Sequence, residues 1–483
     1  MKNARKTKII LLLAAVLGLT SVFAGGSSEN SSNGNIQAVF SNGVLRITTG
    51  GRYVLSGKHE GQVLIQATRN DVVELVLDNL TLHNPNGPAI YAPRSRRVEL
   101  ILADGSVNTI TDGKHPNDEN NAVIFIQHDL IISGNGTLNI TGNFQHGIRS
   151  QDTLTINSGV INVKAAGDAL RGRDAVVIEN GTFSLTAGGD GIQSNNDADA
   201  KLGYVTINGG TFTINAGDDG IQAETALTIN NGSLTITAKD DGITTKGSVV
   251  IKGGTIRIPE CYEGIEGLNV TITGGDIDIF SRDDGINARE YVAATNVQGR
   301  FMGRPAMGRQ PMGRPANENI YVRISGGNIN VHGSTDGIDS NNNIFLEGGT
   351  LRISGPSRGV EGAIDFDGAM LISGGRLVTA GSVAGVSAQS KQPAVLVTYN
   401  QQQQAGALIE IRDTSGKTLL DYTAKNAFLM SGFTSPDFVI GKTYSLYVNR
   451  QKIQDITLNS IVTTVGNSSL NNRGFGGGSR GRW

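Results

Sequence analysis

Residues 216–245 read AGDDGIQAETALTINNGSLTITAKDDGITT and contain one unit twice. The run Asp218-Asp219-Gly220-Ile221 returns 22 residues later as Asp240-Asp241-Gly242-Ile243. Each unit consists of an alternating apolar and polar strand, a turn with two carboxylates and a glycine, and a second alternating strand. Self-similarity at a fixed interval of about 20–50 residues indicates a solenoid.

The same interval extends along much of the chain. One position, directly before each Gly-Ile pair or its equivalent, is occupied in turn by His146, Asp168, Asp190, Asp219, Asp241, Glu263, Asp284, Asp336 and Arg358. The interval is usually 21 or 22 residues, and insertions at 195–203 and 289–319 lengthen it. The alternation within a unit predicts about three strands per turn. We therefore expect an all-β, right-handed parallel β-helix with a period of about 22, the handedness following from the general crossover rule.

Composition agrees with many short strands joined by tight turns. The 483 residues include 66 glycines and only 11 prolines, which excludes collagen-like and proline-rich chains. The near-continuous apolar run 72–77 predicts a buried strand or an end-cap on the first turns. The expected segments are a signal peptide at 1–24, a linker at 25–35, the parallel β-helix at 36–390 with an inserted loop at 289–319, a small antiparallel β module at 391–465, and a flexible tail at 466–483.

The N-terminus has the features of an export signal. A basic stretch with Lys2 and Arg5 precedes an apolar run at 9–19, and Val22-Phe23-Ala24 is a small-x-small cleavage site. The apolar run is too short to span a bilayer, so no transmembrane helix is expected. We expect a secreted, extracellular or cell-surface monomer, with the periplasm as the alternative. The formal net charge of −2 gives no reason to expect nucleic acid.

The acidic turns predict a calcium site. Equivalent residues on successive turns lie about one strand spacing, about 4.8 Å, apart, so their carboxylates repel one another unless a cation binds. Calcium accepts about six to eight oxygen ligands in loose geometry, whereas six histidines and one cysteine make zinc or copper improbable. The predicted metal ligands are Asp190, Asp218, Asp219, Asp240, Asp241, Glu263, Glu266, Asp283, Asp284, Asp336, Asp339 and Glu361.

Several of these features also have a purely structural interpretation. Asp-Gly is ordinary turn chemistry, in which the aspartate caps its own backbone. The glycine is expected to adopt a positive φ at a sharp corner. Asp168 is a weaker candidate ligand because Arg171 could neutralise it, and His146 and Arg358 replace the acid in the first and last units.

In order along the chain, several short motifs resemble a secreted bacterial family of carbohydrate-binding domains, formerly a domain of unknown function. These motifs are residues 51–57 (GRYVLSG), 76–79 (VLDN), 87–91 (GPAIY), 108–113 (NTITDG), 134–138 (GNGTL), His146-Gly147-Ile148 and the Asp-Gly-Ile units that follow. The resemblance implies a calcium-binding, right-handed parallel β-helix similar in shape to pectate lyases, and binding of cellulose and acidic, pectin-like sugars. The chain departs from the family at Gly167-Asp168-Ala169-Leu170 and in the Arg/Met/Pro-rich insertion.

These features favour a non-catalytic protein that binds polysaccharide. Aromatic residues make up only 5% of the chain, so ring stacking on cellulose has less support than calcium-mediated binding of an acidic polysaccharide. The predicted carbohydrate-binding residues are Arg149, Arg171, Arg173, Lys246 and Tyr262. Two alternatives remain open. One is a pectate-lyase-type polysaccharide lyase, whose base would be a lysine such as Lys239, Lys246 or Lys252. The other is a calcium-stabilised adhesin or structural protein.

Overall fold

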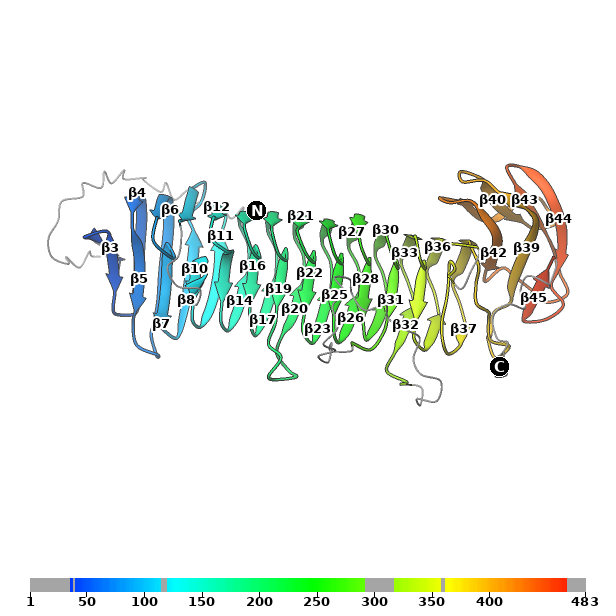
Figure 1. The fold of residues 1–483 in the computed structure, drawn as a ribbon, viewed down its shortest axis with the longest axis horizontal. Helices are drawn as coiled ribbons and strands as arrows, with labels where there is room; N and C mark the ends of the chain where they lie inside the picture. The colour runs from blue at the N-terminus through cyan, green and yellow to red at the C-terminus, as the bar shows by residue number, and fades with distance from the viewer. Residues whose placement is uncertain (1–34, 38–39, 114–119, 292–316, 358–360, 467–483) are drawn as a thin grey trace, which may run out of the picture.

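A computed structural model describes residues 35–37, 40–113, 120–291, 317–357 and 361–466. The predicted signal peptide, most of the predicted linker, most of the inserted loop, Arg358 and the C-terminal tail lie outside these described residues. The described part is all-β and forms an elongated solenoid in which parallel strands are stacked along one axis (Figure 1). It contains no helical segment that could cross a bilayer.

Each turn of the solenoid, here called a rung, contributes three strands. In the rung that begins at the quoted stretch these are β22 (Ile221–Ala223), β23 (Ala226–Ile229) and β24 (Ser233–Ala238). They pair in parallel with the equivalent strands of the next rung, β25 (Ile243–Thr245), β26 (Ser248–Ile251) and β27 (Thr255–Cys261). Three stacks of parallel strands therefore run along the molecule.

The first stack is a 13-stranded sheet that contains β22 and β25. Its other members are β2 (Phe40–Ser41), β3 (Val44–Ile47), β5 (Gln62–Gln66), β7 (Ile90–Arg94), β10 (Ala122–Ile126), β13 (His146–Ser150), β16 (Leu170–Gly172), β19 (Ile192–Ser194), β28 (Ile265–Gly267), β31 (Ile286–Ala288) and β34 (Ile338–Ser340).

The second and third stacks alternate along the chain. Besides β23 and β26, the second contains β8 (Arg97–Leu102), β11 (Asp129–Gly134), β14 (Thr153–Ile156), β17 (Ala175–Ile178), β20 (Tyr204–Ile207), β29 (Asn269–Ile272), β32 (Tyr321–Ile324), β35 (Asn343–Leu346) and β37 (Met370–Ile372). Besides β24 and β27, the third contains β9 (Val107–Asp112), β12 (Thr137–Gly142), β15 (Val160–Ala165), β18 (Thr182–Ala187), β21 (Thr211–Ala216), β30 (Asp276–Ser281), β33 (Asn328–Gly333), β36 (Thr350–Ser354) and β38 (Arg376–Ala380).

The N-terminal strands belong to the solenoid and do not form a separate cap. Strand β1 (Asn35–Gln37) pairs in parallel with β4 (Gly51–Glu60), and β4 pairs with β6 (Val72–Asn84), which includes the apolar run at 72–77. Strand β6 is long enough to pair with both β8 and β9, so it continues into the second and third stacks together. Of the two interpretations of this run, the structure supports the buried strand.

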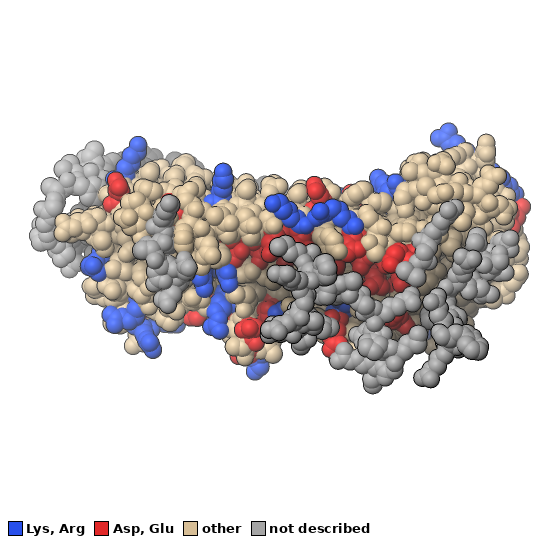
Figure 2. Space-filling model, viewed as in Figure 1, with Lys and Arg blue, Asp and Glu red and all other residues tan. Residues whose placement is uncertain are grey.

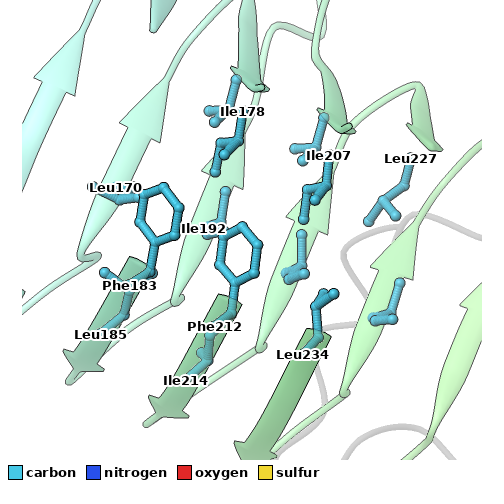
Figure 3. Packing of buried hydrophobic residues seen from close by; sticks show 14 of the residues in the cluster. Leu170, Ile178, Phe183, Leu185, Ile192, Ile207, Phe212, Ile214, Leu227 and Leu234 are labelled. Atoms are coloured by element: carbon cyan, nitrogen blue, oxygen red, sulfur yellow. The ribbon is translucent and has the colours of Figure 1, made fainter. Parts of the chain in front are cut away.

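The core is a set of side-chain ladders enclosed by the three stacks. Along β21 burial alternates strictly: Phe212, Ile214 and Ala216 point inward, and the residues between them face solvent. Phe183 of β18 lies opposite Phe212, and their rings stack with centroids 4.4 Å apart (Figure 3). Burial of each such side chain contributes about 1.5–3 kcal/mol, so the ladders are a principal source of stability.

The C-terminal strands cover the open edge of the solenoid. Strand β42 (Phe428–Thr434) pairs antiparallel with β38 and with β39 (Ala394–Gln403), and β45 (Val462–Val465) pairs in parallel with β39. A separate four-stranded antiparallel sheet follows the order β41 (Thr418–Thr423), β40 (Leu408–Arg412), β43 (Thr443–Val448) and β44 (Gln451–Thr457). An unpaired parallel edge is a site for aggregation, and β42 removes it.

The glycine of the acidic turn is needed for close packing, which corrects the sequence-based expectation of a positive φ. Gly220 does not have a positive φ, whereas Gly232, in the turn between β23 and β24, has a φ of 125°. A Cβ at Gly220 would lie 2.3 Å from Ile236 Cγ2 and 2.5 Å from the carbonyl oxygen of Gly242 in the next rung. The turn therefore lies directly against both the core and its neighbour, and only a residue without Cβ fits.

This packing predicts that Gly220→Ala lowers the free energy of unfolding by about 1–3 kcal/mol, because the added methyl group overpacks a site with no free space. Thermal unfolding followed by circular dichroism would measure the effect. Gly385→Ala is the control, since a Cβ at Gly385 meets no atom within 4 Å. Equal melting temperatures for the two variants would contradict the packing explanation.

Candidate functional site

Six of the predicted acidic residues form one column beside the first stack, each just before a strand of that stack. We call the buried members of this series the acid column. They are Asp190, Asp219, Asp241, Glu263, Asp284 and Asp336, and each is between 2% and 8% exposed. The backbone aligns them: Gly191 N–H donates to the Asp219 carbonyl oxygen, and Gly220 N–H donates to the Asp241 carbonyl oxygen. Acid thus lies beside acid on consecutive rungs.

One oxygen of most of these carboxylates has a structural partner. Asp219 Oδ1 accepts a hydrogen bond of 2.9 Å from the backbone N–H of Asp241, and Asp190 Oδ1 accepts one of 3.0 Å from that of Asp219. The same contact joins Asp284 Oδ1 to the N–H of Asp336 at 2.9 Å. The aspartates therefore cap the next rung and not their own turn. The second oxygen of each carboxylate can then bind a cation or accept another hydrogen bond.

Crowding makes the charged form of these acids costly. Burial, then the charge of Asp168, raises the pKa of Asp190 to about 7. Burial, then the charge of Asp283, raises the pKa of Asp284 to about 7. Burial and the charges of Asp241 and Asp190 also raise the pKa of Asp219. A buried row of this kind is stabilised either by protons or by a bound cation.

Three carboxylates converge in the middle of the solenoid. One oxygen each from Asp218, Asp219 and Asp240 lies within 4.8 Å of the other two; we call this group the middle cluster. Asp218 is exposed, Asp219 is buried and Asp240 is intermediate, so the group opens to the surface on one side. The set is oxygen-only and anionic, which fits a hard cation such as calcium.

A neutral oxygen adds to the donors near the middle cluster. Gln222 is in register with Gln193, whose side-chain amide donates to Asp190 Oδ2 in its own rung. The register places Gln222 beside Asp219 in the same way. Its Oε1 is buried, and the described residues provide no hydrogen-bond partner for it. An unpartnered buried amide oxygen on the same rung as Asp219 supports the fit to a calcium ion.

A second group lies near the C-terminal end of the solenoid. Oxygens of Asp336, Asp339 and Asp365 lie within 4.8 Å of one another; we call this group the C-terminal cluster. Burial, then the charges of Asp284, Asp365 and Asp367, raises the pKa of Asp339 well above its ordinary value. The sequence prediction included Asp336 and Asp339 but not Asp365.

The last rung has a different register from the one predicted. The structure pairs Ile338 with Ile364, and Gly337 N–H donates to the Gly362 carbonyl oxygen. The residue equivalent to Asp336 is therefore Gly362, not Arg358, because this turn is four residues longer than the prediction assumed. As a result Asp365, not Glu361, is the counterpart of Asp339. Glu361 nevertheless lies near the cluster, where its side chain is hydrogen-bonded to Asp336.

One rung between the two clusters contains its own positive charge. Arg289 pairs with Glu266, and its Nη2 lies 3.4 Å from Glu263 Oε1. Asn287 Nδ2 also donates to Glu263 Oε2 at 3.1 Å. The sequence predicted Glu263 and Glu266 as metal ligands; in the structure both carboxylates lie against the buried Arg289 guanidinium, whose single positive charge offsets part of their charge.

The remaining predicted ligands lie in the column without joining either cluster. Asp190 uses both oxygens within the protein, one for Asp219 and one for Gln193. Asp241 Oδ1 accepts from the N–H of Glu263 at 3.3 Å. The rung of Tyr262 separates Asp283 from Asp240. The backbone N–H of Tyr262 donates to the Asp240 carbonyl oxygen, and the N–H of Asp283 donates to the Tyr262 carbonyl oxygen.

On the rung just before the acid column, Asp168 pairs with Arg171 and lies against His146. Arg171 Nη1 lies 3.0 Å from Asp168 Oδ2, as the sequence suggested, and His146 Nδ1 lies 3.1 Å from the same oxygen. Burial alone would raise the pKa of Asp168, but the hydrogen bond and charge of His146 and the charge of Arg171 hold it below its ordinary value. This rung has no need of a metal ion.

The predicted carbohydrate-binding residues are mostly engaged with the protein. Arg149 lies over the Phe125 ring, 5.3 Å from its centroid, and Arg171 is held by Asp168. Lys246 pairs with Glu224 at 2.6 Å and lies 4.7 Å from the centroid of the Tyr291 ring. Arg173 is exposed, and within the described ranges its side chain makes no ion pair, so it is the most available of the five.

Acidic side chains are concentrated over the middle and C-terminal half of one face of the solenoid (Figure 2).

A model for the family described as carbohydrate-binding domain-containing protein matches residues 41–285 and 227–304, which together exceed half of the chain. The chain belongs to this family. Both the acid column up to Asp284 and the whole middle cluster lie within the matched residues.

Two relatives of this carbohydrate-binding domain were compared with it. A carbohydrate-binding domain-containing protein of Acetivibrio thermocellus is 36% identical over 128 residues, which are 25% of this chain and 45% of that protein. This chain therefore covers less than half the length of that relative. A solved structure described as a polysaccharide lyase-like protein from C. thermocellum, a gadolinium derivative, is 30% identical and covers 51% of this chain and 88% of its own, with a TM-score of 0.37.

Some residues of this carbohydrate-binding domain were not found from the sequence. Asp365 follows Ala363-Ile364, and the similarity of that run to Gly337-Ile338-Asp339 was the available signal. Arg289 stands at the start of the insertion, and no pattern in the sequence indicated that its side chain turns back into the column. Gln222 could have been found from register alone, because it lies three residues after Asp219, as Arg171 does after Asp168.

The raised pKa values predict that the metal-free carbohydrate-binding protein loses stability as pH rises. Because the folded-state pKa values of Asp190 and Asp284 are about 7, above the ordinary value of 3.8, the folded state binds more protons than the unfolded state between pH 4 and pH 7. The free energy of unfolding should be highest at the acidic end of this window and fall by an amount on the order of a few kcal/mol by pH 8.

Melting temperatures of metal-stripped protein at pH 5 and pH 8 would measure this fall. The Asp190→Asn/Asp284→Asn variant is the comparison, because asparagine keeps the accepting oxygen and removes the charge. Its melting temperature should change less with pH. A fall of the same size in the variant would show that other groups cause it.

Proposed function

We propose that this protein is a secreted, calcium-dependent binder of acidic polysaccharide, with pectin-like polygalacturonate as the first candidate ligand and cellulose as the alternative. The proposal depends above all on the middle cluster, where three carboxylate oxygens converge on a partly open site. Membership of the carbohydrate-binding domain family supports carbohydrate as the ligand class.

Calcium would connect the carboxylates of the protein with the carboxylates of an acidic sugar. When bound it supplies positive charge and vacant coordination positions, to which water or a uronate carboxylate can bind. Asp218, Asp219 and Asp240 would hold the ion, with Gln222 Oε1 as a further oxygen, and the exposed side of Asp218 leaves access for a ligand. Asp336, Asp339 and Asp365 would form a second site of the same kind.

Arg173 would add a direct contact with an acidic sugar. It is exposed and without an ion-pair partner among the described residues, so its guanidinium can form a bidentate hydrogen bond with a carboxylate. Export of the protein, as residues 1–24 predict, would place it where calcium sites can be weak and still filled, because sites in extracellular modules bind with constants of about 10⁻⁴–10⁻³ M. The proposal includes a right-handed coil, the sense of nearly all parallel crossovers.

Calcium should raise the melting temperature, because a ligand that binds only the native state stabilises it by about 2.7 kcal/mol at 100 times its dissociation constant. The gain should be largely lost in Asp218→Asn/Asp240→Asn, which leaves the structural bond of Asp219 intact. Asp421→Asn, a change of an exposed acid on the C-terminal sheet, is the control and should respond like the unaltered protein. Equal calcium responses in all three proteins would remove the middle cluster as a site.

Retention on insoluble polysaccharide should require calcium. Unaltered protein should bind polygalacturonate gel in calcium and be released by chelator, and Asp218→Asn/Asp240→Asn should be retained less. Retention on cellulose in place of the gel would select the alternative ligand, and retention on neither would favour an adhesin or a structural role.

Soluble polygalacturonate with calcium tests for lyase activity: a rise in ultraviolet absorbance from unsaturated product would contradict a binding-only function.

A further inference from the structure

A pocket of about 300 Å³ lies where the third stack meets the C-terminal antiparallel sheet. Its floor is formed by outward-facing residues of β27, β30 and β33, among them Phe280 and His332. Its far wall is formed by Tyr422 of β41 and by Lys425. This size lies at the lower end of the range for small-molecule sites, which suits a single sugar ring better than a larger ligand.

An exposed aromatic ring lies at the floor of the pocket. Phe280 is 49% exposed, and in the described part of the chain Tyr291 is the other aromatic side chain exposed to a similar extent. Phe280 stacks on His332, its partner in the next rung, with ring centroids 4.2 Å apart and planes 27° from parallel. The stack fixes the orientation of the ring, and about half of the Phe280 surface remains open to the pocket.

The wall is fixed by a bond between the two parts of the molecule. Ser354, which follows His332 in register on β36, shares a hydrogen bond of 2.7 Å between its Oγ and the Tyr422 hydroxyl. The backbone N–H of Lys425 also donates to Ser354 Oγ at 3.0 Å. The outward row Phe280, His332 and Ser354 therefore ends at the wall formed by Tyr422 and Lys425, beside the exposed ring.

Polar side chains surround the Phe280 ring, and some of them make no ion pair within the protein. Arg257 is oriented by bonds to the carboxylate and carbonyl of Asp276. Asp278 and Lys425 are exposed pocket residues, and within the described ranges neither side chain has an ion-pair partner. An aromatic face with a few convergent polar groups is the usual composition of a sugar-binding site, where C–H groups pack on the ring and hydroxyls bond to charged side chains.

We propose that this pocket is a second, calcium-independent subsite for one pyranose ring of a uronate polysaccharide. The C–H face of the sugar packs on Phe280, the Asp278 carboxylate accepts hydrogen bonds from ring hydroxyls, and the ammonium group of Lys425 pairs with the sugar carboxylate. The subsite rests on the proposed function for its ligand class, but its residues are distinct from both acidic clusters and it does not depend on a metal ion.

Isothermal titration of the full chain with trigalacturonate, in excess chelator so that calcium sites are silent, tests the subsite. Unaltered protein should bind, Phe280→Ala should bind at least about tenfold more weakly, and Lys425→Gln should bind several-fold more weakly. With neutral cellotriose as the ligand, Lys425→Gln should have no effect. Tyr291→Ala is the matched control, because it removes the other exposed ring and should leave binding in chelator unchanged.

Absence of binding by the unaltered protein in chelator would overturn the subsite, as would equal affinities of Phe280→Ala and unaltered protein. The melting temperature of each variant confirms that it is folded, and the exposed position of Lys425 provides a second variant that does not disturb the ring stack. Failure of calcium to affect binding, together with binding in chelator that depends on Phe280, would refute the calcium-dependent function and leave the subsite standing.

Discussion

The backbone hydrogen bonds between successive rungs determine most of what this molecule does. Each strand pairs in parallel with its equivalent one turn later, so residues with the same place in the unit lie about 4.8 Å apart. Apolar residues in this arrangement give continuous ladders such as Phe183 on Phe212. Acids in the same arrangement give a row of like charges that no local rearrangement can separate, because moving one would break the backbone register.

The column shows three ways to accommodate that row. Just before its first rung, Arg171 pairs with Asp168, and His146 lies against the same carboxylate. Near its centre the single charge of Arg289 offsets part of the charge of Glu263 and Glu266. At the middle and C-terminal clusters three carboxylate oxygens converge, and burial together with acidic neighbours raises the pKa values of Asp219 and Asp339. The rungs without an internal cation are those where an external one has the most to contribute.

Much of this arrangement could be predicted from the sequence, because register follows from the interval between units. The three strands per turn, the alignment of Asp190 with Asp219 and the partner of Asp168 all follow from counting residues. Counting failed where the chain is irregular. The longer last turn displaced the register from Arg358 to Gly362 and concealed Asp365, and the return of Arg289 into the column depends on a side-chain direction that no interval encodes. The glycine was predicted correctly in place but for the wrong physical reason, since its role depends on contact with the next rung.

The distance between the two clusters has a consequence for any ligand that is a linear polymer. The middle cluster joins the rungs of Asp219 and Asp241, and the C-terminal cluster joins those of Asp336 and Asp365. Four rung spacings separate them, or roughly 19 Å along the axis. A polymer lying along the solenoid could contact both clusters at once, and its second contact would form at an effective concentration in the millimolar range. Two weak sites at a fixed separation would then give avidity, with a preference for long chains over short ones.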